Sequence, residues 1–145
     1  MRIRPAHTIY VGKNKMFQIL NRDLAATTTG QYPYASIAIT NADSAFGKLA
    51  VSENQKGVLK IKFDDIPEQI EGMTLFTAVH ANKILDFYQS IAKDVTLFIV
   101  NCEQGICRSA AVGAGLSRIV NGEDVWFFER FSPNQYAYDG MCQVI

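Results

Sequence analysis

Two segments near the middle of the chain have the clearest strand patterns. In Val58 to Asp64, apolar and polar side chains alternate, as in a strand with one buried face. Val95 to Val100 is a nearly continuous apolar run, which is typical of a strand buried on both faces in a parallel sheet. Ile3 to Val11 and Tyr34 to Thr40 also have strand-like compositions. We therefore predict a strand at each of these four places.

The longest predicted helix runs from Leu75 to Ala92, where apolar side chains line one broad face. Thr74 precedes this segment as a candidate N-cap. A second helix is predicted over Ala110 to Val120, whose small residues would allow it to pack closely on a sheet. The Asn121-Gly122 pair is a stop signal for that helix.

Shorter helices are predicted near both ends of the chain. Apolar residues recur at roughly helical spacing over Met16 to Leu24, which predicts a short amphipathic helix. Ser132-Pro133-Asn134 has the composition of a cap and first turn, and we predict a last helix from there through Met141. Asn41 to Lys48 and Asp65 to Gly72 are polar and rich in turn-forming residues, so we predict that they are loops.

Large aromatic side chains gather shortly before the last predicted helix, without a clean helical or strand period. We expect them to form a satellite of the core rather than a substrate-binding box, because aromatic side chains mainly supply buried area. The cluster consists of Trp126, Phe127, Phe128 and Phe131.

The composition is that of an ordinary globular protein. The chain has 145 residues, enough for one domain with a full core, and we assign residues 1–145 to a single domain. Basic and acidic residues balance at 14 each, so no broad attraction to nucleic acid or a membrane surface is expected. The apolar runs are too short to span a bilayer, and the N-terminus has no apolar signal core. Three cysteines suit a reducing compartment, and the cytoplasm is the expected location.

The segment from Asn101 to Ser109 carries the strongest candidate chemistry. It joins the apolar strand to the small-residue helix, where backbone N–H groups and the positive end of a helix attract an anion. Gly105 permits a backbone conformation that a side chain would resist, and the Arg108 fork can hold two phosphoryl oxygens. The same positive field favours the nucleophilic thiolate form of Cys102. We expect one tetrahedral anion to be bound by the residues of this loop, which are Glu103, Gln104, Gly105, Ile106, Cys107 and Arg108.

This segment resembles the Cys-x5-Arg-Ser/Thr signature of the protein tyrosine phosphatase superfamily, and of its dual-specificity branch in particular. The resemblance implies that Cys102 is the nucleophile, Arg108 the phosphate clamp and Ser109 the hydroxyl that eases departure of the thiolate. It also implies an α/β fold of one domain, with helices flanking a central, mostly parallel sheet. The Pro133-Asn134 pair is similar to the one that opens the final helix in this branch. Asn101 is a departure from the pattern, because the family usually has His before the Cys.

A phosphatase of this kind needs a general acid that gives a proton to the leaving oxygen. In the dual-specificity branch an Asp does this from a loop after the strand one step upstream, and Asp64 and Asp65 occupy that place here. Strand alternation favours Asp65, which continues the inward side of Phe63, whereas Asp64 shares the solvent-facing side of the lysines. We predict that Asp65 is the acid, with Asp64 as the alternative.

The remaining cysteines and histidines give weaker signals. Cys107 is interpreted first as a small apolar residue packed beneath the loop, and alternatively as a redox partner of Cys102. Cys142 is expected to be an unremarkable thiol. His7 and His80 have no metal-ligand spacing to each other or to the cysteines, so we predict no metal site.

The resemblance extends from about Val58 to about Met141 and implies a phosphatase that forms a phosphocysteine intermediate and needs no cofactor. The expected substrate is a phosphorylated protein, on phosphotyrosine or phosphoserine/threonine, or a small phosphomonoester. We expect a monomer with no nucleic-acid or membrane partner, although RNA 5′-phosphate and other non-protein substrates stay as alternatives. A second functional class is a pseudophosphatase module that binds phosphate but has lost efficient turnover, and Asn101 is the feature that points to it.

Overall fold

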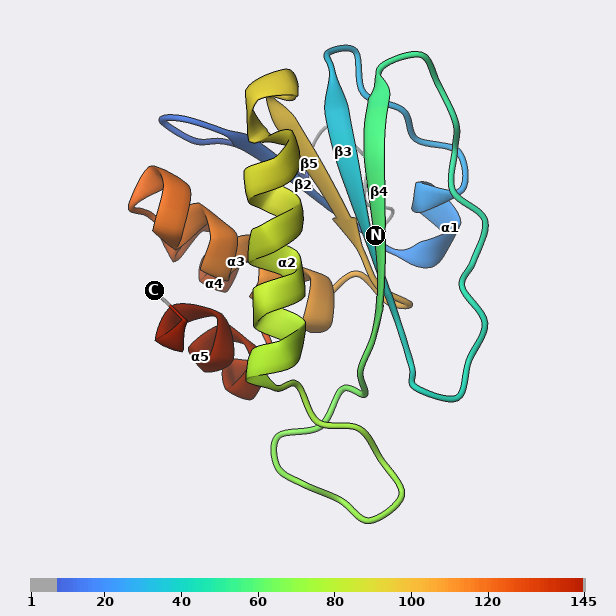
Figure 1. The fold of residues 1–145 in the computed structure, drawn as a ribbon, viewed down its shortest axis with the longest axis vertical. Coiled ribbons are helices and arrows are strands. Elements are labelled where there is room, and N and C mark those ends of the chain that lie inside the picture. The colour runs from blue at the N-terminus through green and yellow to red at the C-terminus, as the bar shows by residue number, and fades with distance from the viewer. Residues whose placement is uncertain (1–7, 145) are drawn as a thin grey trace.

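A computed structural model describes residues 8–144, which form a five-stranded sheet with helices on both of its faces (Figure 1). Along the sheet the strands follow the order β1-β2-β5-β3-β4. Neighbouring strands are parallel, except that β1 and β2 form an antiparallel pair. This is the single-domain, mostly parallel α/β fold that the resemblance implied. The strands are β1 (Ile9–Val11), β2 (Met16–Leu20), β3 (Tyr34–Thr40), β4 (Gln55–Lys62) and β5 (Leu97–Asn101).

The two faces of the sheet are covered unequally. Four helices cover one face and enclose the main core, whereas one short helix and the loop that connects β3 to β4 lie over the other (Figure 1). The four are α2 (Ala78–Ile91), α3 (Arg108–Asn121), α4 (Val125–Arg130) and α5 (Gln135–Gln143); the single one is α1 (Arg22–Ala25). A 3-10 turn, η2 (Ala92–Asp94), follows α2. None of the helices in residues 8–144 is long and apolar enough to cross a membrane.

Several predictions of element position are confirmed. The strand over Tyr34 to Thr40 has the predicted bounds, and the apolar run at Val95 to Val100 becomes β5, at the centre of the sheet. The small-residue helix is α3, and it ends at Gly122 in the left-handed conformation, with a φ of 77°. Asn134 caps the last helix by accepting a hydrogen bond from the Ala137 N–H.

The predicted helix over Met16 to Leu24 is wrong. Met16–Leu20 is strand β2, and only Arg22–Ala25 is helical. The strand pairs with β5 on one side and β1 on the other, and its side chains are buried on both faces of the sheet. A short apolar run buried in this way contains apolar residues at helical spacing too, so periodicity alone does not separate the two structures.

Other boundaries differ from the predictions by a few residues. Strand β4 begins at Gln55 rather than Val58, and α2 begins after Thr77 rather than Thr74. Only Ile9–Val11 of the predicted first strand forms β1, and residues 3–7 lie outside the described part of the chain.

Most of the aromatic cluster lies on a short helix, α4, that the sequence did not predict. Phe127 is fully buried in the main core, and Trp126 and Phe131 pack against it, as expected of a core satellite. Phe128 is partly exposed and contacts the ring of Tyr138.

Candidate active site

The loop between β5 and α3 is shaped by one glycine and by the end of strand β2. Gly105 has a φ of 69°, and a Cβ at this position would lie 2.5 Å from the backbone nitrogen of Asn21. Two backbone hydrogen bonds join the segments: the Arg22 N–H donates to the Glu103 carbonyl at 3.2 Å, and the Cys102 N–H donates to the Leu20 carbonyl at 3.4 Å. Any other residue at position 105 would be strained and would also clash with the backbone, so the curl of the loop depends on this glycine.

Cys102 lies at the base of this loop, directly after β5, and is only 2% exposed. The Gly105 N–H donates a hydrogen bond to its Sγ at 3.3 Å, and the Ser109 Oγ lies 3.2 Å from the same sulfur. The N-terminus of the 14-residue helix α3 follows the loop. The Gly105 N–H, the Ser109 hydroxyl and the N-terminus of α3 would all stabilise negative charge on the sulfur, as nucleophilic cysteines require.

Arg108 is the first residue of α3 and is 5% exposed. Its Nη1 donates to the Asn41 Oδ1 at 2.7 Å and to the Phe63 carbonyl at 2.9 Å. These contacts fix the guanidinium plane and leave Nε and Nη2 for another acceptor. Within residues 8–144 the side chain forms no ion pair. A buried cation without a carboxylate partner is stabilised when an anion binds to it.

A small hollow of about 210 Å³ brings these groups together. Its volume suits a phosphoryl group, and Cys102, Arg108 and Asp65 border it, whereas Ser109 contacts the sulfur without lining the hollow and Asp64 does not line it. The residues lining it are Asp65, Cys102, Glu103, Gln104, Cys107 and Arg108. The structure therefore brings Cys102, Arg108 and Asp65 to one hollow, although Asp65 lies far from the other two in the chain. Gly105 and Ile106 belong to the loop but do not line the hollow.

Asp64 and Asp65 have opposite environments. Asp64 is buried, and its carboxylate accepts hydrogen bonds from the Thr74 N–H at 2.7 Å and the Ala42 N–H at 3.2 Å. Its own N–H donates to the Thr74 carbonyl, so Asp64 closes the base of the loop that carries Asp65. Asp65 is exposed and borders the hollow that contains Cys102.

The alternation argument for choosing between the two residues was wrong, because the strand ends at Lys62. Beyond it the backbone leaves the strand path, and Phe63 and Asp64 are both buried. Asp64 faces the backbone of the loop rather than solvent, and it does not line the cysteine hollow. Asp65 borders the hollow because of where the chain leaves the strand, which strand parity does not describe.

Asn134 was noted in the sequence only as a helix cap, yet it connects three parts of the site. Its Nδ2 donates to the Asp65 Oδ1 at 2.8 Å and to the Ile66 carbonyl at 3.2 Å. Its backbone N–H donates to the Cys107 carbonyl at 2.9 Å. Asn134 thus holds the Asp65 carboxylate beside the loop between β5 and α3. The Pro-Asn pair was the signal that could have suggested a site role.

Cys107 is half-buried, at the N-terminus of α3. Burial raises the pKa of its thiol, and the nearby charge of Asp65 and a hydrogen bond to that carboxylate raise the pKa further. A thiol held in the protonated form is a poor nucleophile, which supports a packing and hydrogen-bonding role rather than a redox partnership with Cys102.

Asn101 occupies the position before the cysteine. It is 7% exposed, and its Oδ1 accepts no hydrogen bond from any residue within 8–144. A buried acceptor left without a donor destabilises a protein by about 1–3 kcal/mol. Asn101 does not line the hollow.

His80 is a structural residue of α2. Its Nδ1 accepts a hydrogen bond from the Thr77 N–H, and its Nε2 lies 2.9 Å from the Lys62 carbonyl. No group of three His, Cys, Asp or Glu side chains within the described residues could hold a metal ion.

Comparison with solved structures identifies this architecture. Human DUSP28 aligns with a TM-score of 0.64 over 93% of each chain, at 12% sequence identity. Tk-PTP in its active form aligns with a TM-score of 0.57 over 95% of this chain and 98% of its own, also at 12% identity. The chain has the phosphatase fold. A human tyrosine phosphatase-like serine/threonine/tyrosine-interacting protein aligns similarly, with a TM-score of 0.62 over 94% of this chain and 93% of its own, at 13% identity.

Sequence comparison adds nothing to this structural likeness. No protein-family model matches the chain, and no curated protein is significantly similar to it. At these identities the likeness to solved structures shows the fold, and the chemistry must be argued from the residues of the site.

Proposed function

We propose that the protein is a cysteine-dependent phosphatase that hydrolyses phosphate monoesters through a phosphocysteine intermediate. One observation carries the proposal: the thiol of Cys102, the guanidinium of Arg108 and the carboxyl of Asp65 border one phosphate-sized hollow. The thiol can attack phosphorus, the guanidinium can bind the phosphoryl oxygens, and the carboxyl group can give a proton to the leaving oxygen. No other arrangement within the described residues combines a buried thiol, an unpaired buried cation and a carboxyl group.

In the first half of the reaction, the Cys102 thiolate attacks phosphorus and the bond from phosphorus to the leaving oxygen breaks. Arg108 and the loop N–H groups hold the remaining phosphoryl oxygens, and protonated Asp65 gives its proton to the departing oxygen. In the second half, Asp65 takes a proton from a water molecule that attacks the phosphocysteine. Inorganic phosphate is released, and the Ser109 hydroxyl stabilises the departing thiolate through its contact with the sulfur.

We propose phosphotyrosine and phosphoserine/threonine in proteins as the substrates. Phosphoinositides and RNA 5′-phosphates are the alternatives, and PTPMT1, a structural neighbour with a TM-score of 0.50, was crystallised in complex with PI(5)P. The balance of charge around the hollow favours the protein substrate, because among residues 8–144 Arg108 is the only cation that lines it and Glu103 and Asp65 flank it. A polyanionic substrate would be repelled by these carboxylates. The free state of Cys102, Cys107 and Cys142 supports a cytoplasmic location.

The second candidate is a pseudophosphatase that binds phosphate without efficient turnover. The specific observation in its favour is Asn101, whose orphaned buried oxygen lies immediately before the nucleophile. Retention of Cys102, Arg108 and Asp65 around one hollow, with Ser109 in contact with the cysteine sulfur, favours the enzyme.

Hydrolysis of p-nitrophenyl phosphate in the presence of EDTA separates the two candidates. We expect metal-independent turnover by the wild-type protein and none by the Cys102→Ser variant, which should still bind phosphate or vanadate. Binding by both proteins without turnover by either would establish the pseudophosphatase instead. Turnover that persists in the variant would show that Cys102 is not the nucleophile.

A further inference from the structure

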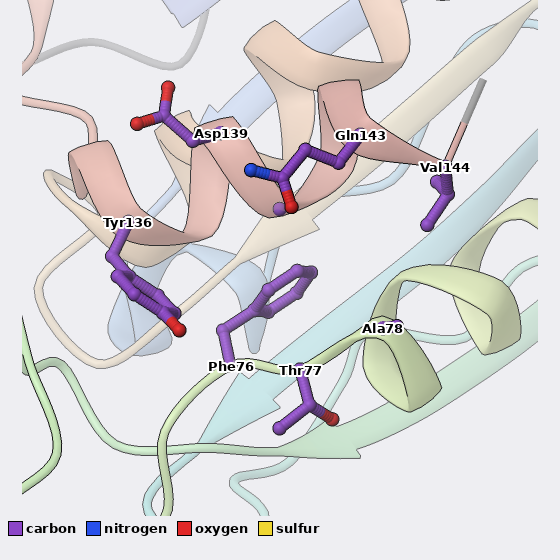
Figure 2. Close-up of a pocket in the computed structure, with 8 residues that line it drawn as sticks. Phe76, Thr77, Ala78, Tyr136, Asp139, Gln143 and Val144 are labelled. Atoms are coloured by element: carbon purple, nitrogen blue, oxygen red, sulfur yellow. The ribbon is translucent and has the colours of Figure 1, made fainter.

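A second hollow, of about 310 Å³, lies between α5 and the start of α2 (Figure 2). Its floor is the ring of Phe76, and Tyr136 and Gln143 extend from α5 on the side of that ring, whereas the carboxylate of Asp139, also on α5, points away from it. Gly140 contributes no side chain here, and a Cβ on it would lie 2.8 Å from the Phe76 ring. The hollow therefore has an aromatic base.

Shared lining residues link this hollow to the catalytic one. A third hollow of about 350 Å³ has Tyr136 and Asp139 in common with the first and Asp65 in common with the catalytic one. The three hollows therefore follow one another from the loop that contains Cys102, past Asp65, to α5, and we call this row of hollows the groove. A peptide that places its phosphorylated residue over Cys102 can extend along this groove.

The charges along the groove have one sign outside the phosphate clamp. Its lining includes Asp65, Glu103 and Asp139, whereas Arg108 is the single cation among the described residues that line it. The Oδ1 of Asp139 accepts a hydrogen bond from the Gln135 Nε2 at 2.8 Å, which orients the carboxylate and leaves Oδ2 for a ligand. Tyr136, which also lines the groove, is 43% exposed.

We propose that this groove binds the flanking sequence of a phosphorylated protein substrate and that a lysine or arginine side chain binds beside Asp139. The aliphatic stem would lie along the ring of Tyr136, with the cationic head at the Asp139 carboxylate. The inference rests on the proposed phosphatase function and narrows its substrate class to phosphoproteins with a basic residue near the phosphorylated one.

The test measures binding, so it does not depend on turnover. Phosphotyrosine peptides of equal length, carrying Lys, Ala or Glu at each flanking position in turn, are titrated into the Cys102→Ser protein. We expect one flanking position at which Lys tightens binding by about two- to fivefold over Ala, the range of a partly exposed ion pair, and at which Glu weakens it.

Charge reversal at Asp139 identifies the contact. Asp139→Lys, made in the Cys102→Ser background, should abolish the preference for Lys and reverse it toward Glu. The matched control is Asp86→Lys, which makes the same charge change at an exposed position of α2 that does not line the groove, and it should keep the preference. In the otherwise wild-type protein, Asp139→Lys should leave p-nitrophenyl phosphate hydrolysis unchanged, because that substrate is too small to reach α5.

Three results would overturn the inference: no preference for Lys at any position, equal effects of the two charge reversals, or tighter binding of PI(5)P vesicles or a 5′-phosphorylated RNA than of the best basic phosphopeptide. Failure of the proposed function gives a different result. In that case the wild-type protein hydrolyses no phosphoester, whereas the Lys preference and its loss in Asp139→Lys can still be measured.

Discussion

Asp64 and Asp65 are neighbours in the chain, yet the same Asp→Asn substitution should damage different properties at the two positions. Asp65 borders the hollow that holds Cys102, whereas Asp64 is buried and accepts two backbone hydrogen bonds at the base of the loop. We predict that Asp65→Asn loses turnover and keeps stability, and that Asp64→Asn loses stability first.

The size of the effect at Asp65 depends on the leaving group. An amide has no acidic proton to donate, so hydrolysis of a phosphoserine peptide should fall by about 10²–10⁴-fold. A nitrophenolate leaves without protonation, so kcat/KM for p-nitrophenyl phosphate, which covers the steps up to formation of the phosphocysteine, should be affected much less. The high-pH limb of the phosphopeptide rate profile should disappear with the acid. The free energy of unfolding should change by less than about 1 kcal/mol, because Asp65 is exposed and Asn can still accept from Asn134.

The effect at Asp64 follows from its hydrogen bonds. Asn keeps the size of the side chain but points an N–H₂ group at the N–H of Thr74 or Ala42, so one charge-assisted bond is lost and one buried donor is left unpaired. Such bonds contribute about 1.5–3 kcal/mol each. We expect a loss of about 2–4 kcal/mol, which lowers the Tm of a chain of this length by on the order of 10 °C.

Thermal unfolding and kcat/KM for both substrates, measured on the two variants in parallel, separate these effects. Small and equal losses at both positions would mean that neither carboxyl is the acid, and Glu68 and Glu71 on the same loop would be the next candidates. Loss of phosphopeptide turnover in Asp64→Asn, with its melting temperature unchanged, would exchange the two roles.

Three further variants test other parts of the account. Arg108→Lys should lower kcat by at least about 10²-fold, measured with p-nitrophenyl phosphate, because a point charge replaces neither the fork nor its bonds to Asn41 and Phe63. Gly105→Ala should destabilise the protein more than the control Gly122→Ala, as measured by denaturant unfolding. Gly122 has a similar φ of 77°, but nothing lies within 4 Å of a Cβ added there, so the control should lose only about 1–2 kcal/mol. Equal losses in the two variants would refute the clash at Gly105. Partial burial lowers the pKa of His80 below 6.5, so the unfolded chain binds more protons at this residue than the folded chain does. The free energy of unfolding should therefore fall as the pH is lowered from 7.5 through 6.5 to 5.5. Thermal unfolding of His80→Gln should show a weaker decline, and an unchanged decline would contradict this origin.

The loop between β5 and α3 could be predicted from the sequence because its determinants are local. The strand before it, Gly105 within it and the helix after it lie in one stretch of chain, and each has its own physical signature. The central position of β5 also followed from its apolar run. By contrast, β2 was taken for a helix, because a short apolar run has no unique period.

The contacts that complete the site are long-range, and the sequence could not supply them. Asn134 contacts Asp65, a residue 69 positions earlier, and Arg108 donates to Phe63, which is 45 positions earlier. The environments of Asp64 and Asp65 depend on where the chain leaves strand β4, and strand alternation does not extend past that point. The groove toward α5 depends on the packing of two helices and could only be found in the structure.

The central claim is that the Cys102 sulfur forms a covalent bond to phosphorus during turnover. Rapid acid quenching of the enzyme during hydrolysis of a phosphopeptide, followed by mass spectrometry of its proteolytic peptides, tests this directly. The account predicts one phosphoryl group on Cys102, accumulating further in Asp65→Asn with p-nitrophenyl phosphate, because that leaving group departs unaided while the step that activates water is slowed. Turnover with an unmodified Cys102, or with the phosphoryl group on another residue, would contradict it.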